Sequence, residues 1–65
     1  MQYEITIEKH WSNITYNVAL NSYESNGRGM SSGRAFDVSY NEAIKEASKQ
    51  AGIYNAPIIK KEGVK

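Results

Sequence analysis

Apolar residues occupy every second position of residues 3–8 and again of residues 14–21, which predicts two β-strands. A period of two is typical of a strand that has one dry face and one wet face. If both strands turn their dry faces to one core, odd positions of the first must lie opposite even positions of the second. We expect three opposed pairs, namely Ile7 with Ile14, Ile5 with Tyr16, and Tyr3 with Val18, with a short loop at residues 9–13.

A third strand is expected at residues 34–38, with Phe36 and Val38 on its dry face. Antiparallel pairing would place Val18 opposite Phe36 and Tyr16 opposite Val38, and would centre the turn on Gly27, which follows Asn26 in a common turn dipeptide. The polar, glycine-rich residues on either side of this turn fit a mobile loop or a long hairpin arm. The pattern alone leaves both forms open.

Residues 39–52 have the features of one amphipathic helix. Ser39 and Glu42 form a capping box at its start, and Gly52 is expected to end it in the left-handed conformation, with Ile53 packing behind. The apolar stripe between them is mostly alanine and consists of Tyr40, Ala43, Ile44, Ala47 and Ala51. Because this stripe is thin, the helix can lie close to the sheet, and the strands must supply the bulk of the core.

These elements predict an α+β fold, a three-stranded antiparallel meander followed by one helix packed on its dry face. Residues 1–54 form this single β-β-β-α domain, and residues 55–65 form a tail that we expect to be partly disordered. In the tail, Pro57 excludes a central strand, so Ile58 and Ile59 are expected to pack on the helix or on a sheet edge. The expected core is made of Tyr3, Ile5, Ile7, Ile14, Tyr16, Val18, Leu20, Phe36, Val38, Ile44 and Ile53.

Composition narrows the function classes. The 65 residues carry a net charge of +1 and contain no cysteine. This charge excludes a strongly basic nucleic-acid binder and an acidic DNA mimic, and one histidine cannot assemble a zinc site, so no metal or cofactor is expected. No apolar stretch approaches the roughly 18 residues of a membrane span, and the first residues lack the features of a signal peptide. We therefore expect a cytoplasmic protein without a membrane partner.

The first loop holds the residues that we expect to bind a partner protein, Trp11 and His10. An aromatic side chain at a hairpin tip can anchor a partner, although Trp11 would also serve as a cap over the open end of a small core. His10 lies near Glu8, but no second histidine and no nucleophile stands at a recognisable catalytic spacing. We therefore expect no enzyme.

A glycine-rich loop with two arginines gives the alternative, a nucleic-acid or phosphate site. Backbone N–H groups and guanidinium groups in such a loop suit phosphate contact, although the Gly-Lys-Ser/Thr ending of a P-loop is absent. The alternative requires the loop, the exposed helix face and the tail to converge on one side. Its residues are Arg28, Arg34, Lys45, Lys49, Lys60 and Lys61.

The outer face of the expected sheet carries three carboxylates and no aromatic ring. This disfavours docking of the sheet into a DNA groove, which needs cations, and an RNA-recognition sheet, which needs exposed aromatics. We read it as a solvated face or as an edge-and-face surface for another protein, since an edge strand with free backbone groups is open to pairing. Its expected members are Glu4, Thr6, Glu8, Thr15, Asn17, Ala19, Asn21, Ala35 and Asp37.

A meander that leads through Ser39-x-x-Glu42-Ala43 into a helix resembles the partial RNase-H-like domain of HicB-family antitoxins. The alternating residues of the first two strands, Tyr3-x-Ile5-x-Ile7 and Tyr16-x-Val18, carry the rest of this resemblance. It covers residues 1–53 and lacks the family's Pro-Asp-Leu-Pro-Gly turn and any DNA-binding extension. It implies an antitoxin-like domain, or an inhibitor encoded by a mobile element, that binds a protein.

The same stretch is also similar to the C-terminal two-thirds of a double-stranded-RNA-binding domain, whose final helix begins Ser-Lys-Lys-x-Ala-Lys. Tyr40 and Asn41 stand where that family places the lysines that grip RNA, and its first helix has no counterpart here.

The sequence thus predicts a small non-catalytic domain that binds another protein, with nucleic-acid binding as the alternative. Formation of a homodimer is a further alternative, because association stabilises a domain of this size.

Overall fold

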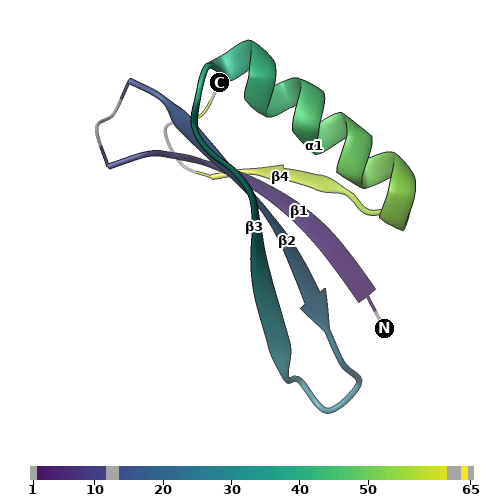
Figure 1. Ribbon diagram of the computed structural model, residues 1–65. Coiled ribbons are helices and arrows are strands. Elements are labelled where there is room, and N and C mark those ends of the chain that lie inside the picture. The colour runs from purple at the N-terminus through teal and green to yellow at the C-terminus, as the bar shows by residue number, and fades with distance from the viewer. Residues whose placement is uncertain (1, 12–13, 62–63, 65) are drawn as a thin grey trace.

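The fold is a four-stranded mixed sheet with one helix on one face (Figure 1). The computed structural model describes residues 2–11, 14–61 and 64. The α+β class is confirmed, but the sheet is not the expected three-stranded antiparallel meander, because a fourth strand, β4, joins β1 in parallel and gives the order β3-β2-β1-β4. The elements are β1 (Gln2–Lys9), β2 (Tyr16–Tyr23), β3 (Gly29–Val38), α1 (Tyr40–Tyr54) and β4 (Ile58–Lys60).

β4 comes from the segment that we assigned to the tail. Ile58 and Ile59 lie opposite Ile5 and Thr6, so the expectation of packing at a sheet edge is confirmed. Pro57 directly precedes the strand, a position at which the sheet does not require a backbone N–H donor. Its carbonyl accepts the N–H of Ile5 at 2.9 Å. The expected disorder of the last residues falls mainly on positions 62, 63 and 65, which lie outside the described residues.

The pairing of β1 with β2 follows the expected parity but not the expected pairs. Ile5 lies opposite Leu20 and Ile7 opposite Val18, so each residue of β1 meets a residue four positions later than expected. Ile14 consequently lies in the loop and is 80% exposed, which makes its assignment to the core wrong. Since strand periodicity is two, a shift of four keeps every side chain on its face, and alternation alone does not select between the registers.

The connection of β2 to β3 is a long hairpin arm, one of the two forms left open by the sequence. Glu24 and Arg28 close a three-residue turn, in which the N–H of Gly27 donates to the Glu24 carbonyl at 3.0 Å and Gly27 has φ of 86°. The strands on either side remain paired up to Tyr23 and Gly29. In Figure 1 the tip of this arm extends well past the end of α1.

Two irregularities in β3 change which of its residues face the core. Tyr16 lies opposite Val38 as expected, but Val18 lies opposite Ala35 rather than Phe36. A bulge adds residues to one strand and so reverses the alternation beyond it. Ala35, expected on the outer face, therefore packs against the core, whereas Phe36, expected in the core, is 65% exposed.

The helix begins where it was predicted to and ends three residues later. The Oγ of Ser39 accepts the N–H of Glu42 at 3.2 Å, which confirms the N-cap. Gly52 was wrongly predicted as the C-terminal residue: the helix continues to Tyr54, and Asn55 takes the left-handed conformation with φ of 51°. The longer helix brings the Tyr54 ring to 4.8 Å from the ring of Tyr3, a contact that ending at Gly52 would lose.

The core lies between the sheet and the alanine stripe of α1, as expected. Its fully buried large side chains come from the strands, and Ile44 lies only partly buried beside it. Ile53 is exposed, so its assignment to the core is wrong as well. Among the described residues, no helix combines the length and apolar character that crossing a membrane requires. The buried core residues are Ile5, Ile7, Val18, Leu20, Ala43 and Ala47.

Candidate functional site

The two edges of the sheet differ in how well they are protected from pairing with another strand. β4 has only three residues, follows Pro57 and ends on Lys60. Short length, proline and lysine are features that prevent edge-to-edge association. β3, at the other edge, has ten residues, Gly29–Val38.

Only the second half of β3 has comparable protection. Both register shifts lie there, and Ala35 and Val38 line a hollow together with α1. The first half, residues 29–33, pairs with β2 without irregularity and contains no proline and no charged residue. No other described strand pairs with its outer side. We call residues 29–33 the open edge.

The turn indicates which backbone groups the open edge presents. The N–H of Glu24 donates to the carbonyl of Arg28 at 2.7 Å, so these two residues form a hydrogen-bonded pair. In an antiparallel ladder, such pairs alternate with pairs whose N–H and C=O groups point away from each other. Counting from Arg28, the residues that direct their backbone groups away from β2 are Gly29, Ser31 and Gly33.

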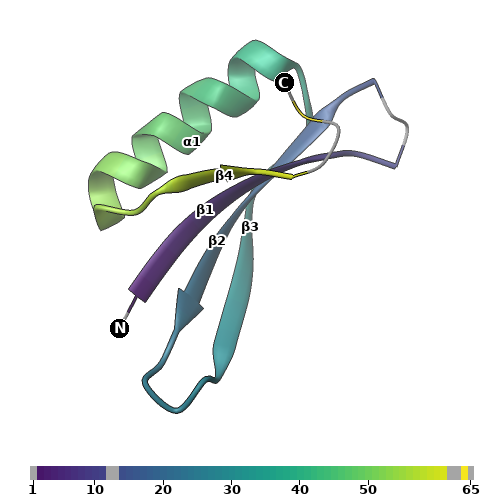
Figure 2. The ribbon, with the colours of Figure 1, turned by 180° about the vertical axis from the view of Figure 1, so that it is seen from behind.

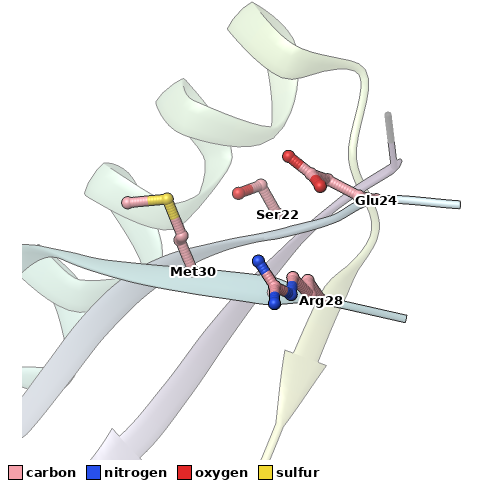
Figure 3. A pocket seen from close by; sticks show the side chains of 5 residues that line it. Ser22, Glu24, Arg28 and Met30 are labelled. Carbon is pink, nitrogen blue, oxygen red and sulfur yellow. The ribbon is translucent and has the colours of Figure 1, made fainter. Parts of the chain in front are cut away.

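The side chains along the open edge leave this backbone accessible. The three residues with outward backbone groups are glycine or serine, and all three are exposed, although the rings of Tyr23 and Phe36 lie where side chains of Gly29 and Gly33 would stand. Met30 lies between them, opposite Ser22, and is 79% exposed. Figure 3 shows both side chains projecting from the same face of the arm, next to a shallow hollow that Glu24 and Arg28 also line. The ribbon of α1 does not cover the tip of the arm (Figures 1 and 2), and Tyr54, the last residue of α1, lines a hollow with Met30 and Ser32.

The loop with His10 and Trp11 lies at the end of the sheet opposite to the arm tip (Figure 1). Trp11 is 89% exposed, so it does not act as a cap over the core. The Nδ1 of His10 is 3.0 Å from the Oδ1 of Asn17, which also accepts the N–H of Asp37. Because that oxygen is an acceptor, His10 has to carry its hydrogen on Nδ1. The centroids of the His10 and Trp11 rings lie 5.4 Å apart.

The six cations of the alternative site do not converge. Arg28 lies at the arm tip, and the guanidinium of Arg34 stands 5.9 Å from the ring centroid of Tyr54. Lys45 and Lys49 line the hollow between α1 and β3, which they share with Glu42 and Glu46. Lys60 donates to the hydroxyl of Tyr40 at 3.0 Å, and Lys61 follows it at the opposite edge of the sheet. The geometric condition set for this site is therefore not met.

Neither pKa shifts nor clusters of metal-ligating side chains point to a further site among the described residues. The negative charge of Glu4 raises the pKa of Tyr23 above its ordinary value of 10.0, helped by desolvation and by a hydrogen bond from the phenol to Glu4 at 3.3 Å. The phenol thus remains a donor at neutral pH. Within the described residues, no group of three or more His, Asp or Glu side chains is arranged to hold a metal ion.

Comparison with family models, with curated proteins and with solved structures finds no match for this chain. Function is therefore inferred from the surfaces of the molecule itself. Sequence reasoning expected an edge strand open to pairing, but it began the third strand at residue 34 and so missed that the open edge is residues 29–33. Its signal was present in the sequence, because residues 29–33 follow an Asn26-Gly27 turn and contain none of the residues that protect an edge.

Proposed function

We propose that this chain is a non-catalytic protein-interaction domain that accepts an extended strand of a partner along the open edge of β3. One observation carries the proposal. In a sheet whose other edge is short and protected, a regular stretch of edge strand presents the N–H and C=O groups of Gly29, Ser31 and Gly33 to solvent.

Strand addition requires an accessible backbone at these residues, and all three are exposed. A partner strand gains affinity from main-chain hydrogen bonds and specificity from alternate side chains. Gly29 and Gly33 are small for a reason within the chain, since an added Cβ would meet the rings of Tyr23 and Phe36. Met30, on the face that α1 occupies, supplies an apolar contact for one side of the incoming strand.

A narrower form of the proposal is an antitoxin-like or inhibitor role in the cytoplasm. The resemblance of residues 1–53 to HicB-family domains supports it. That resemblance rests on three strands followed by a helix, and β1, β2, β3 and α1 follow one another in this order. Nucleic-acid binding is less well supported, since its cations lie at opposite edges of the sheet and Glu42 and Glu46 lie beside two of them.

The test compares two substitutions at one position of the open edge. Ser31→Pro removes an outward N–H without removing a hydrogen bond to β2, and Ser31→Ala keeps the N–H as the matched control. Extended peptides are selected from a display library on the immobilised wild-type domain, and their affinities are measured for all three proteins. We expect the peptides to bind the wild type and Ser31→Ala equally and to lose affinity for Ser31→Pro.

Selected peptides that bind all three proteins equally but fail on Trp11→Ala would contradict strand addition and place the interface at the first loop. Labelled duplex DNA, duplex RNA and single strands provide the second comparison. Affinity that falls steeply with salt, and that Arg28→Ala with Arg34→Ala abolishes, would favour the nucleic-acid alternative instead.

A further inference from the structure

The open edge is suited to pairing with a copy of itself. A two-fold axis makes each residue i of one copy face residue j of the other, and residue j face residue i. The edge therefore has to offer hydrogen-bonding groups at positions symmetric about the axis. Gly29 and Ser31 are such a pair, because both direct their backbone groups outward and Met30 stands midway between them.

We propose that the strand accepted by the open edge is β3 of a second copy of this chain, antiparallel, with the two-fold axis at Met30. The inference rests on the proposed function and names its partner. In this register, Gly29 lies opposite Ser31 of the second copy and exchanges both hydrogen bonds with it, and the symmetric pair does the same. The two four-stranded sheets become one continuous sheet with both helices on the same face.

Burial of Met30 favours this register. At the axis, the side chain of Met30 faces Met30 of the second copy in a non-hydrogen-bonded pair, the kind in which side chains approach each other most closely. Met30 is 79% exposed in the single chain, and Ser22, its neighbour on β2, leaves room beside it. Pairing thus covers an apolar side chain that the fold itself leaves in water.

Charge selects against the neighbouring symmetric register. An axis at Ser31 would form more backbone hydrogen bonds, but it would place Arg28 directly opposite Arg34 of the second copy. Like charges opposed across two strands are destabilising. With the axis at Met30, Arg28 instead lies opposite Ser32, and Arg34 lies beyond the paired stretch. The two arginines thus limit pairing to the residues between them.

The absence of cysteine from the sequence allows a direct test by disulfide trapping. Met30→Cys puts the two thiols opposite each other at the axis, whereas Ser32→Cys, on the same face, lies opposite Arg28. Trp11→Cys, an exposed site at the other end of the sheet, reports random collision. In a glutathione buffer, we expect Met30→Cys to form the disulfide dimer more than about tenfold faster than both controls, because pairing raises the effective thiol concentration.

The wild-type chain gives a second measurement that needs no substitution. Its amide resonances are followed by NMR over a range of protein concentrations. We expect the amide resonances of Gly29 and Ser31 to shift as the concentration rises. In the cross-linking experiment, we expect Ser31→Pro to abolish the disulfide dimer when it is combined with Met30→Cys. Circular dichroism of each variant verifies that it is folded.

Three results would overturn the inference: equal rates for Met30→Cys and Trp11→Cys, faster trapping of Ser32→Cys than of Met30→Cys, or amide positions that do not depend on concentration. If these occur while selected peptides still discriminate between the wild type and Ser31→Pro, the second copy is the wrong partner and strand addition stands. If the peptides also fail to discriminate, both proposals fall.

Discussion

Asn17 holds the backbone of Asp37 in place across two neighbouring strands: its Oδ1 accepts the Asp37 N–H at 3.0 Å. Asp37 has a φ of 57°, a left-handed conformation that costs energy for a residue with a side chain. The hydroxyl of Thr15 adds a second link by donating to the Asp37 carboxylate at 2.6 Å. This arrangement stabilises the bulge that turns Phe36 to the outer face.

Asn17→Ala should therefore destabilise the domain by about 0.5–1.5 kcal/mol, the usual net value of one hydrogen bond. The control is Asp37→Gly, which loses the link to Thr15 but removes the strain of a positive φ, and it should lie close to the wild type. Urea unfolding followed by circular dichroism compares the two. An Asp37→Gly variant that is much less stable than Asn17→Ala would show that the carboxylate, not the backbone conformation, matters at this bulge.

Two glycines should respond to alanine in opposite directions. Gly27→Ala introduces a side chain at φ of 86° and should cost about 1–2 kcal/mol. Gly52 lies inside α1 with open space around it, so Gly52→Ala should stabilise the domain by about 0.5–1 kcal/mol. Thermal melts rank the three proteins. A stabilising Gly27→Ala would contradict the turn, and a destabilising Gly52→Ala would contradict the longer helix.

Ser39→Ala should destabilise the domain by roughly 0.5–2 kcal/mol, because the first turn of α1 loses the acceptor for the Glu42 N–H. Ser48→Ala is the matched control, since Ser48 is an exposed residue within the same helix and alanine has the higher helix propensity. Melts followed by circular dichroism should place Ser48→Ala at or above the wild type. Equal losses in both variants would mean that the cap contributes nothing specific.

Loss of a large side chain from the sheet should cost more than loss of one from the helix. Ile5→Ala leaves a cavity beneath Ala43 and Ala47 and should destabilise by about 2–5 kcal/mol, a large fraction of the stability of so small a domain. Ile44 lies only partly buried, so Ile44→Ala should cost clearly less. Denaturant midpoints measured at equal protein concentration decide the order, and a reversed order would mean that α1 covers the sheet through a different face.

The pair of Tyr23 and Glu4 should make stability sensitive to alkaline pH. The folded chain holds the phenol proton more firmly than the unfolded chain, because its pKa lies above the ordinary 10.0. The stabilising contribution is therefore complete below about pH 10 and is lost as the pH rises through the folded value. Glu4→Gln should lower the pKa of Tyr23 towards its ordinary value. Tyrosinate absorbance, with Tyr23→Phe to assign the signal, measures the change.

Local signals in the sequence predicted the local features of this fold. Ser39 identified the start of α1, Asn26-Gly27 identified the turn of the arm, and the alanine stripe identified the face that meets the sheet. Each depends on a few neighbouring residues whose conformational preferences agree. The pairing parity of the first two strands was predictable for a similar reason, since one buried face imposes it.

The features that were predicted wrongly depend on contacts between residues far apart in the sequence. Ile14 continues the alternation of β2, but the register that seats Ile5 and Ile7 against two aliphatic residues, Leu20 and Val18, leaves it in a loop. The bulge that exposes Phe36 needs Asn17 on another strand. β4 is too short to give a periodic signal, and only its pairing with β1 makes it a strand.

The parallel pairing of β4 with β1 has a consequence for synthesis of the chain on the ribosome. β1 emerges first, yet the strand that covers its second edge emerges only after β2, β3 and α1 have been made. Until then, Ile5 and Thr6 belong to an edge strand, and the nascent sheet is open on both sides. A truncation before Ile58 would make that transient state permanent, so such fragments should aggregate even though every residue of the meander and the helix is present.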